Sequence, residues 1–530
     1  MKKLIRTSFA LLFGVALIAS CNQKEPAVEY TMTADRAAIS DIAANNPNDE
    51  TLVLKTNVAN WLVLTPDWVT ATPNAGAGNE KGVIITLKIA SNYKNEATDT
   101  APRSGSLKFS GSGVTLEIPI SQNGHTAVVD PNASIGGITD LAEFEKFVAA
   151  VNEGNALSRW KNTSGEIELL ADIDLSSYSE WTPIGAVEST GNGNNASAPK
   201  GSPFTGVFNG GGHTIKNFKA SSGAIADGRT WGLFGCIQFA TVKNLTLEAD
   251  VTLEAEATAD AGVLAGTVYC SIIENVKVKG KVNVKGTKTE GKRFAIGGIA
   301  GFAFAILEEG IAYDTNIKDC EVNLEVKGNS GANTKNGATS VHFGGICGFC
   351  TNPKDDSRVN IENCTVNGSL AIDCGRCAGL AGVGNAGTIF KNCVNNANQV
   401  NNFANGREAG LVCVIAVNCA IINCVNNGNL TTTDSATTAG GMFALLNDNS
   451  CYIEGGANYG TILCTNASYK GLLGANFSKF DHVSGVTVSG KIGTDASNLA
   501  DVNSSNFMDY IGFVVDGAAE KISNLSFVAK

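Results

Sequence analysis

The sequence predicts an all-β protein: an N-terminal Ig-like β-sandwich followed by a long parallel β-helix, a solenoid, with an N-terminal capping helix. Residues 30–124 hold short runs in which apolar and polar residues alternate, as in half-buried strands. Residues 138–160 hold apolar residues at helical spacing. Beyond residue 160 the chain is rich in Gly and Asn and repeats a short unit, which is typical of stacked strands.

The composition excludes several classes of protein. Apolar residues make up 43% of the 530 residues without long runs, and 17% are charged, so the chain is neither disordered nor embedded in a membrane. Fifty acidic residues against 39 basic ones give a net charge of −11, and no basic cluster interrupts the acidic background. We therefore expect no nucleic-acid partner and no polybasic membrane patch.

Residues 1–20 predict an export signal. Lys2, Lys3 and Arg6 precede an apolar stretch over residues 9–18 that is too short for a transmembrane helix. The stretch ends in Ile18-Ala19-Ser20-Cys21, which resembles a bacterial lipobox. This resemblance implies that residues 1–20 are removed and that Cys21 is lipidated, with residues 21–29 as an anchored linker. A plain secretory signal that happens to contain Cys is the alternative.

The residues after Cys21 favour the outer membrane. Asn22 differs from the Asp that retains lipoproteins in the inner membrane, and Lys24-Glu25 resembles a surface-export signal of Bacteroidetes lipoproteins. Loss of the three basic residues changes the net charge from −11 to −14. We expect an acidic protein anchored by its lipid to the outer membrane, at the cell surface.

Residues 30–124 predict the β-sandwich. Val83, Ile85, Leu87 and Ile89 lie at every second position and so share one face of a strand, and the same period recurs over 114–120. About 95 residues of such strands suit an Ig-like sandwich.

This segment resembles the BACON domain, a module of Bacteroidetes surface proteins and glycosidases. The resemblance lies in Trp61-Leu62, Trp68-Val69, the turn over 103–107 and the closing stretch over 118–124. It implies carbohydrate binding, for which Trp61 and Trp68 are the candidate glycan contacts because indole rings stack on sugars. The alternative is that both rings pack in the core and the domain is a spacer.

A linker over 125–137 leads to the predicted capping helix over 138–160. Leu141, Phe144, Val148 and Val151 fall on one face, and Asp140 with Glu143 forms a start like a capping box. We expect this helix to cover the open end of the solenoid, which is otherwise an exposed sheet edge.

Residues 161–530 repeat two units. The first has the form aliphatic-x-Asn-apolar and recurs with its Asn or Asp at 217, 244, 275, 319, 363, 392, 423 and 524. The second has the form Gly-aliphatic-x-Gly and begins at 232, 298, 345, 379 and 471. Stacked short strands bury their aliphatic residues only against neighbouring copies, while Asn and Gly suit the corners, so the repeats predict a parallel β-helix.

This part resembles the β-helix lipoproteins and adhesins that contain GLUG motifs. The resemblance begins with the stretches over 170–175, 181–185 and 204–215 and extends to residue 530. It implies the architecture and leaves the activity open.

The cysteines fit the same repeat. Apart from Cys21 there are 14, and Cys320, Cys364, Cys393 and Cys424 all follow the Asn or Asp of a repeat. We therefore expect free thiols in the core, with no metal and no cofactor. The alternatives are disulfides and a zinc site at the pairs Cys347/Cys350 and Cys374/Cys377, which have zinc-ligand spacing.

Catalytic patterns are weak. Asp172 and Asp174 lie two residues apart and resemble a turn motif of the GLUG family, and the four histidines, at 125, 213, 342 and 482, have no nucleophile motif beside them. We expect no catalytic residues and no enzyme. Thr100 and Ser435, each between Asp and Ala, resemble short O-glycosylation sequons of Bacteroidetes exported proteins.

These observations predict a lipid-anchored, adhesin-like binding protein of the cell envelope. It would contact glycans or host glycoproteins through the β-helix and the BACON-like domain, as a monomer attached to the membrane by its lipid. The alternatives are a β-helix enzyme that acts on polysaccharides, a lyase or hydrolase, and a stalk that binds nothing.

Overall fold

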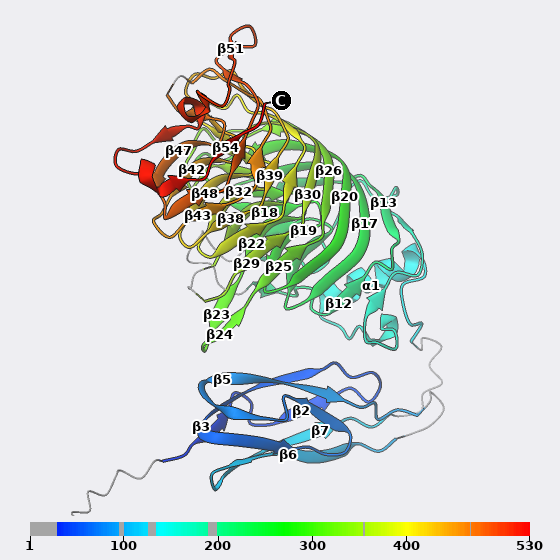
Figure 1. Ribbon diagram of the computed structural model, residues 1–530. Helices are drawn as coiled ribbons and strands as arrows, with labels where there is room; N and C mark the ends of the chain where they lie inside the picture. Colours follow the sequence, from blue (N-terminus) through cyan, green and yellow to red (C-terminus); the bar gives the residue numbers. More distant parts are fainter. Residues whose placement is uncertain are drawn as a thin grey trace, which may run out of the picture. The chain divides into compact units, whose positions relative to one another are not determined.

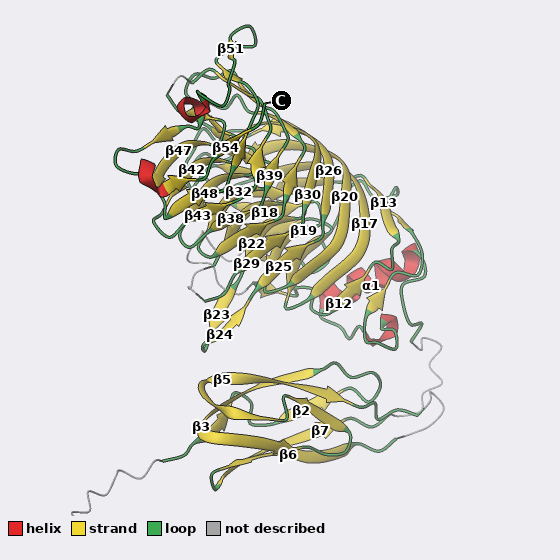
Figure 2. Cartoon of the chain, viewed as in Figure 1, coloured by secondary structure: helices red, strands yellow, loops and turns green. Residues whose placement is uncertain are grey.

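The computed structural model describes residues 29–94, 100–125, 134–188, 199–352, 356–466 and 468–529. Strands dominate these residues, and their single α-helix is α1 (Leu141–Glu153), so the all-β prediction is confirmed (Figures 1 and 2). None of the helices in these ranges has the length and apolar character needed to cross a membrane. The predicted signal peptide and Cys21 lie outside the described residues. The chain divides into two compact units.

The N-terminal unit is a seven-stranded antiparallel β domain. Its strands pair in the order β2-β7-β6-β3-β5-β4, with β1 beside β3. Ile85, Leu87 and Ile89 are buried as their period predicts, Val83 is half-buried, and Phe109 is also fully buried. The strands are β1 (Met32–Ala34), β2 (Ile39–Ile42), β3 (Glu50–Leu64), β4 (Val69–Thr72), β5 (Ala75–Ile89), β6 (Arg103–Gly111) and β7 (Val114–Gln122).

The second unit consists mainly of three sheets in which each repeat adds strands beside those of the repeat before it (Figure 1). The pairings described for these sheets are parallel except at β10, β11 and β51. The long sheet contains β8 (Ile167–Glu168), β9 (Ile173–Asp174), β12 (Val207–Asn209), β13 (Thr214–Phe218), β14 (Ser221–Ile225), β17 (Thr241–Ala255), β20 (Ile272–Thr287), β25 (Thr315–Lys318), β26 (Glu321–Asn329), β29 (Val359–Glu362), β30 (Thr365–Asp373), β33 (Thr388–Lys391), β34 (Val394–Asn395), β35 (Asn398–Val400), β38 (Ala420–Ile422), β39 (Val425–Asn426), β40 (Leu430–Thr432), β43 (Tyr452–Glu454), β44 (Ala457–Asn458), β45 (Ile462–Cys464), β48 (His482–Ser484), β49 (Thr487–Val488), β50 (Ile492–Gly493), β51 (Leu499–Ala500), β53 (Ile522–Ser523) and β54 (Ser526–Phe527).

Two further sheets complete each repeat. One contains β10 (Val187–Glu188), β11 (Lys200–Gly201), β15 (Arg229–Trp231), β18 (Ala259–Gly262), β21 (Phe294–Gly297), β27 (Val341–Gly344), β31 (Arg376–Ala378), β36 (Arg407–Ala409), β41 (Thr438–Gly440) and β46 (Lys470–Gly471). The other contains β16 (Phe234–Gln238), β19 (Ala265–Tyr269), β22 (Ala300–Phe304), β28 (Cys347–Thr351), β32 (Ala381–Asn385), β37 (Val412–Ala416), β42 (Phe443–Asn447), β47 (Gly474–Lys479) and β52 (Phe513–Val514). A hairpin, β23 (Ile306–Glu308) and β24 (Ile311–Tyr313), and the short 3-10 helices η1 (Ser158–Trp160), η3 (Phe507–Tyr510) and η4 (Ala519–Lys521) lie outside these sheets.

The repeated Asn forms the predicted left-handed corner. All eight repeated Asn and Asp residues have φ between 51° and 57°, a conformation that Asn tolerates well. Their side chains also bond from one repeat to the next: the Asn275 Nδ2 donates to the Asn244 Oδ1 at 2.9 Å, and the Asn363 Nδ2 donates to the Asp319 Oδ1 at 3.0 Å.

The glycines of the second unit serve close packing. A Cβ at Gly345 would lie 2.7 Å from a methyl carbon of Val366, and one at Gly379 would lie 2.4 Å from the Asn395 Cγ. The backbone therefore touches an inward side chain of the long sheet at this corner, and only Gly leaves room for it.

The cysteine ladder is confirmed by the register. Lys318 pairs with Glu362 and Glu321 with Thr365, which places Cys320 beside Cys364. The pairing of β29 and β30 with β33 and β34 places Cys393 on the other side of Cys364. Each of the 14 cysteines within the described ranges is a buried free thiol, as predicted, including Cys347 on strand β28.

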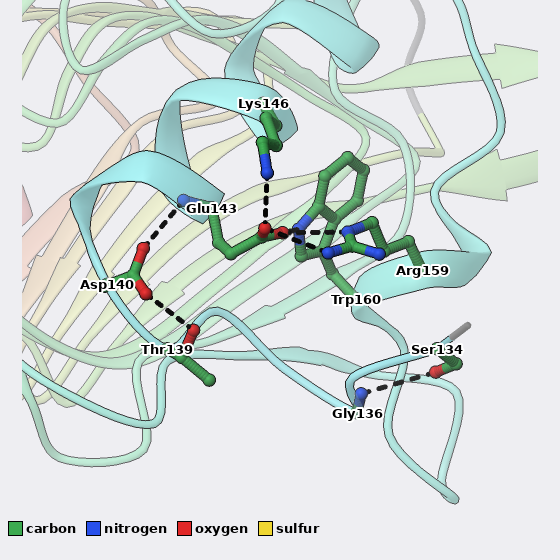
Figure 3. A network of polar contacts seen from close by, with 8 residues as sticks. All are labelled: Ser134, Gly136, Thr139, Asp140, Glu143, Lys146, Arg159 and Trp160. Atoms are coloured by element: carbon green, nitrogen blue, oxygen red, sulfur yellow. Dashed lines mark hydrogen bonds and ion pairs between the residues drawn. The ribbon is translucent and has the colours of Figure 1, made fainter. Parts of the chain in front are cut away.

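Helix α1 packs at the start of the repeats and lies inside the predicted stretch. Phe144 and Phe147 are fully buried, and the Phe147 ring lies 6.0 Å from that of Phe204 and 5.7 Å from that of Phe208. The Asp140 Oδ1 caps the helix by accepting a hydrogen bond from the Glu143 backbone N at 2.9 Å (Figure 3).

Glu143 fixes the helix to the segment that follows it. Arg159 donates to both carboxylate oxygens at 2.9 Å, the Trp160 Nε1 donates at 3.0 Å and the Lys146 Nζ donates at 2.8 Å (Figure 3). The hydrogen bonds from Arg159 and Lys146 lower the pKa of Glu143 to about 2.

Candidate functional site

A groove in the outer face of the long sheet is the strongest candidate for a site. It has a volume of about 530 Å³ and crosses strands β17, β20, β26 and β30, with β13 at one end. The lining residues are Asn217, Lys219, Glu248, Ala249, Asp250, Lys279, Gly280, Asn323, Glu325, Gly368 and Ser369.

The floor of the groove is a row in which side chains are small or point inward. Ala249 pairs with Gly280, Gly280 with Leu324 and Leu324 with Gly368, and the Leu324 side chain is buried beneath the sheet. Gly280 and Gly368 have φ of 129° and 97°, and a Cβ at Gly280 would lie 1.9 Å from the Ala249 carbonyl oxygen. Only Gly fits there, so the floor is exposed backbone.

One wall is the row Glu248, Lys279 and Asn323, which pair in register on β17, β20 and β26. The Lys279 Nζ lies 2.6 Å from the Glu248 Oε1. Both side chains are about half exposed, so the pair adds little stability, and its atoms remain accessible to a ligand.

The opposite wall is the row Asp250, Lys281, Glu325 and Ser369. A hydrogen bond from Lys327 to Glu325, together with the charges of Lys327 and Lys281, lowers the pKa of Glu325. Glu325 is therefore ionised at neutral pH and accepts hydrogen bonds.

The two walls place carboxylates, ammonium groups, an amide and a hydroxyl around a bare backbone floor. Such a set can bind a ligand rich in hydroxyl groups. A search of the described residues finds no cluster of three His, Cys, Asp or Glu side chains suited to a metal ion. Sequence reasoning did not select these residues; Gly280 within the strand pattern of 276–284 was the available signal.

The N-terminal domain has a smaller hollow of about 400 Å³ lined by Asn60, Trp61, Leu62, Ala75 and residues at the β6–β7 turn. Trp61 is 2% exposed and its Nε1 donates to the Ala77 carbonyl oxygen at 2.9 Å, and Trp68 is 8% exposed. Neither proposed glycan contact therefore has a free ring face, whereas Leu62 is exposed at the hollow.

The acidic pair noted in the sequence bonds to the next repeat. The Asp172 Oδ1 accepts a hydrogen bond from the Thr214 backbone N at 3.0 Å and lies 3.4 Å from the His213 Nδ1. Asp174 accepts hydrogen bonds from the Asn217 side chain at 3.0 and 3.1 Å. Hydrogen bonds from Thr214 and from Ser176 lower the pKa of Asp172 and of Asp174 respectively.

The other three histidines each have local partners. His125 packs edge-on against Tyr93, and His342 is fully buried and stacks on Phe349. His482 lies between Asp481 and Glu454, at 3.1 and 3.0 Å.

The two proposed glycosylation residues differ in accessibility. Ser435 is exposed in a turn in which Asp434 accepts a hydrogen bond from the Ala436 backbone N. Thr100 is half-buried, and its hydroxyl donates to the Asn92 carbonyl oxygen and accepts from the His125 backbone N.

Comparison with known families gives one match. Residues 55–123 match the BACON family, whose description is "Putative binding domain, N-terminal". This match supports a binding function for the chain. A search of curated proteins finds no match.

The solved structures that are similar to the chain include the following two. One is described as a "putative immunoglobulin A1 protease from Bacteroides ovatus", with 16% identity and a TM-score of 0.35, over 76% of this chain and 86% of that one. The other is described as "IgA1 Protease", with 12% identity and a TM-score of 0.40, over 92% of this chain and 30% of that one. At these values the likeness itself assigns no fold and no activity to this chain.

The names of these structures correct one prediction. We expected no enzyme, and both similar proteins are named as proteases, so that exclusion is wrong as stated and is withdrawn.

Proposed function

We propose that the chain is a lipid-anchored, adhesin-like binding protein of the outer-membrane surface that contacts glycans or host glycoproteins. In this proposal Cys21 carries the lipid, residues 30–124 form a BACON-like Ig sandwich, and residues 161–530 form a GLUG-type parallel β-helix. The protein acts as a monomer.

The observation that supports glycan binding is the groove in the long sheet. Its walls carry Glu248, Lys279, Asn323, Glu325 and Ser369, which donate and accept hydrogen bonds in the way that sugar hydroxyls require. The BACON match supports binding independently of the groove, because its residues 55–123 include none of the groove residues.

A glycan array probed with detergent-purified full-length protein tests this proposal. We expect wild type to bind, and Asn323→Tyr, which fills the groove, to lose at least tenfold in affinity. Asn283→Tyr is the matched control, since Asn283 is an exposed asparagine on the adjacent strand outside the groove. No binding by wild type, or equal loss in both variants, would contradict the proposal.

A second candidate is supported by the carboxylates of the groove. Glu248, Asp250 and Glu325 lie on its walls, and enzymes that cleave polysaccharides use carboxylates as acid, base or nucleophile. Incubating the bound polysaccharide with wild type and with the double variant Asp250→Asn/Glu325→Gln tests this. New chain ends released by wild type alone would favour a lyase or hydrolase, and intact polysaccharide would exclude one for that substrate.

The anchor has its own test. Cys21→Ala should move the protein from the membrane fraction to the soluble fraction without changing its melting temperature, because Cys21 precedes the first strand, β1. Persistent attachment to the membrane would contradict lipidation at Cys21.

A further inference from the structure

We propose that the groove binds one uncharged, linear polysaccharide chain that runs across the strands, in the stacking direction, with successive sugars against successive repeats. This inference rests on the proposed function and adds the class, direction and length of the ligand.

The register of the paired strands indicates the direction in which the ligand runs. Both walls and the floor are rows of residues paired across β17, β20, β26 and β30, so equivalent positions recur at the strand spacing of about 4.8 Å. A ligand that lies along these rows meets a polar pair at each strand, one residue from each wall. A polymer of similar units matches that periodic surface better than a single compact molecule does.

The length follows from the two ends of the groove. At one end Asn217 and Lys219 come from the region of the short strand β13. At the other end lies Ser369 on β30, and in the next repeat the long strand is replaced by the short strands β34 and β35. Four long strands therefore form the groove, which is room for about four sugars at the strand spacing.

The residues that line the groove indicate the charge of the ligand. The lining holds three carboxylates, those of Glu248, Asp250 and Glu325, and the ammonium groups of Lys219 and Lys279, and Lys281 in the second wall adds a third ammonium group. Lys279 pairs with Glu248, and Lys327 beside the groove pairs with Glu325. Counted with Lys327, four ammonium groups stand against three carboxylates, so the groove lacks the strong positive charge that attracts a polyuronate or a sulfated chain.

A glycan fits this surface better than an extended peptide. A peptide that adds to a sheet bonds to the free backbone groups of an edge strand. The backbone of β20 is already paired with β17 on one side and with β25 and β26 on the other, and β26 is paired with β20 and β30. The groove lies on a sheet face, where side chains alone can recognise the ligand.

The lining also predicts how affinity depends on length. The groove residues in the described part of the chain include no aromatic side chain, so no sugar gains the stacking contact that usually dominates glycan binding. Each sugar is then held by a few hydrogen bonds of modest net strength. Several units must bind together before the affinity becomes useful.

Calorimetric titration of the full-length protein tests the inference. The probes are manno-, xylo- and malto-oligosaccharides of one to six units, oligogalacturonates of the same lengths, and an extended neutral peptide. For at least one uncharged series, we expect affinity to rise roughly threefold to tenfold per added unit and to level off near four units. Ser369→Tyr, at one end, should remove the gain from the last unit while leaving binding of shorter chains intact.

The outcomes separate this inference from the proposed function. Glycan binding that depends on Asn323 but does not increase with chain length overturns the linear-chain inference and leaves the proposed function standing. Stronger binding of oligogalacturonates, or of the peptide, overturns the assigned ligand class. Failure of every glycan to bind overturns both.

Discussion

Early and late repeats fill the same inward position of the long sheet in different ways. Leu247, Val278, Val322 and Val366 occupy it on the continuous strands β17, β20, β26 and β30. The next three repeats have Asn395, Asn426 and Asn458 there, all fully buried. The change from apolar residues to asparagine coincides with the end of the long strands, although the later Val488 takes the same position on the short strand β49.

The buried asparagines satisfy the backbone where the strand ends. The Asn426 Oδ1 accepts from the Gly428 backbone N at 3.2 Å and from the Asn395 Nδ2 at 2.8 Å, and its Nδ2 donates to the Gly428 carbonyl oxygen at 3.0 Å and to the Asn458 Oδ1 at 2.8 Å. These amides bond to the backbone at the place where the long strands, and the groove on them, end.

The largest effect is expected where a charge enters the apolar ladder. Cys364→Asp would bury a carboxyl group between Cys320 and Cys393 and should lower the free energy of unfolding by about 3–5 kcal/mol. Cys364→Val keeps volume and apolar character and should cost less than about 1.5 kcal/mol. Urea unfolding of both variants measures the difference.

Thiol labelling of folded wild type checks the same ladder. Hydrogen bonding with Cys320 and Cys393, together with burial, raises the pKa of Cys364, so this thiol should label slowly. Rapid labelling, or equal stability of the two variants, would show that the ladder position is wrong.

The next effect tests the amide ladder. Asn426→Val removes four hydrogen bonds and leaves their buried partners unpaired, and we expect a loss of about 3 kcal/mol in the free energy of unfolding. Asn427→Val is the control, since Asn427 is exposed and bonds through its side chain to Asn396. Equal melting temperatures for the two variants would show that the buried Asn426 contributes no more stability than the exposed Asn427.

A third test concerns a buried carboxyl group in the late repeats. Glu408 occupies the position filled by Ile296, Phe343 and Cys377 in earlier repeats, and neither of its carboxyl oxygens has a hydrogen-bond partner among the described residues. Burial raises the pKa of Glu408 well above its ordinary value of 4.5. Glu408→Met should therefore stabilise the protein at pH 7, by about 2 kcal/mol.

The pH dependence identifies the cause. Above about pH 4.5 the unfolded chain releases the Glu408 proton and the folded chain keeps it, so stability falls by up to about 1.4 kcal/mol per pH unit. Glu408→Gln keeps a buried polar group but should abolish this slope. A slope unchanged in Glu408→Gln would assign it to other groups.

The sequence predicted those features that depend on neighbours within one repeat. The left-handed corners at Asn244 and Asn363 follow from a local conformational preference, and Asp140 caps α1 as its spacing to Glu143 predicts. The place of Cys364 could be predicted because its copies recur at one position of the repeated unit.

The groove could not be predicted in this way. Its walls are outward polar residues such as Lys279 and Asn323, which alone look like any solvated strand face. They form a site only because Gly280 pairs with Leu324, and Leu324 with Gly368, in the sheet. The residues of each pair are 44 positions apart in the sequence. The burial of Trp61 and Trp68, by contrast, agrees with the core packing that the sequence analysis kept beside glycan contact.

The smallest expected effect compares the repeats with the helix that precedes them. Glu143 binds Arg159, Trp160 and Lys146, so Glu143→Gln should weaken the attachment of α1 by about 1–2 kcal/mol while later repeats keep their own contacts. The Arg159 and Lys146 bonds hold the pKa of Glu143 at about 2, below its ordinary value of 4.5. The contribution of Glu143 to stability is therefore complete above about pH 4.5 and is lost as the pH falls toward 2, so its pH dependence is opposite in sign to that of Glu408.

Hydrogen exchange resolved along the chain measures this effect. At neutral pH, Glu143→Gln should show faster exchange in residues 141–160. Lys146→Ala is the milder control, because Lys146 is exposed. Uniform acceleration through the late repeats would mean that α1 and the repeats unfold as one unit.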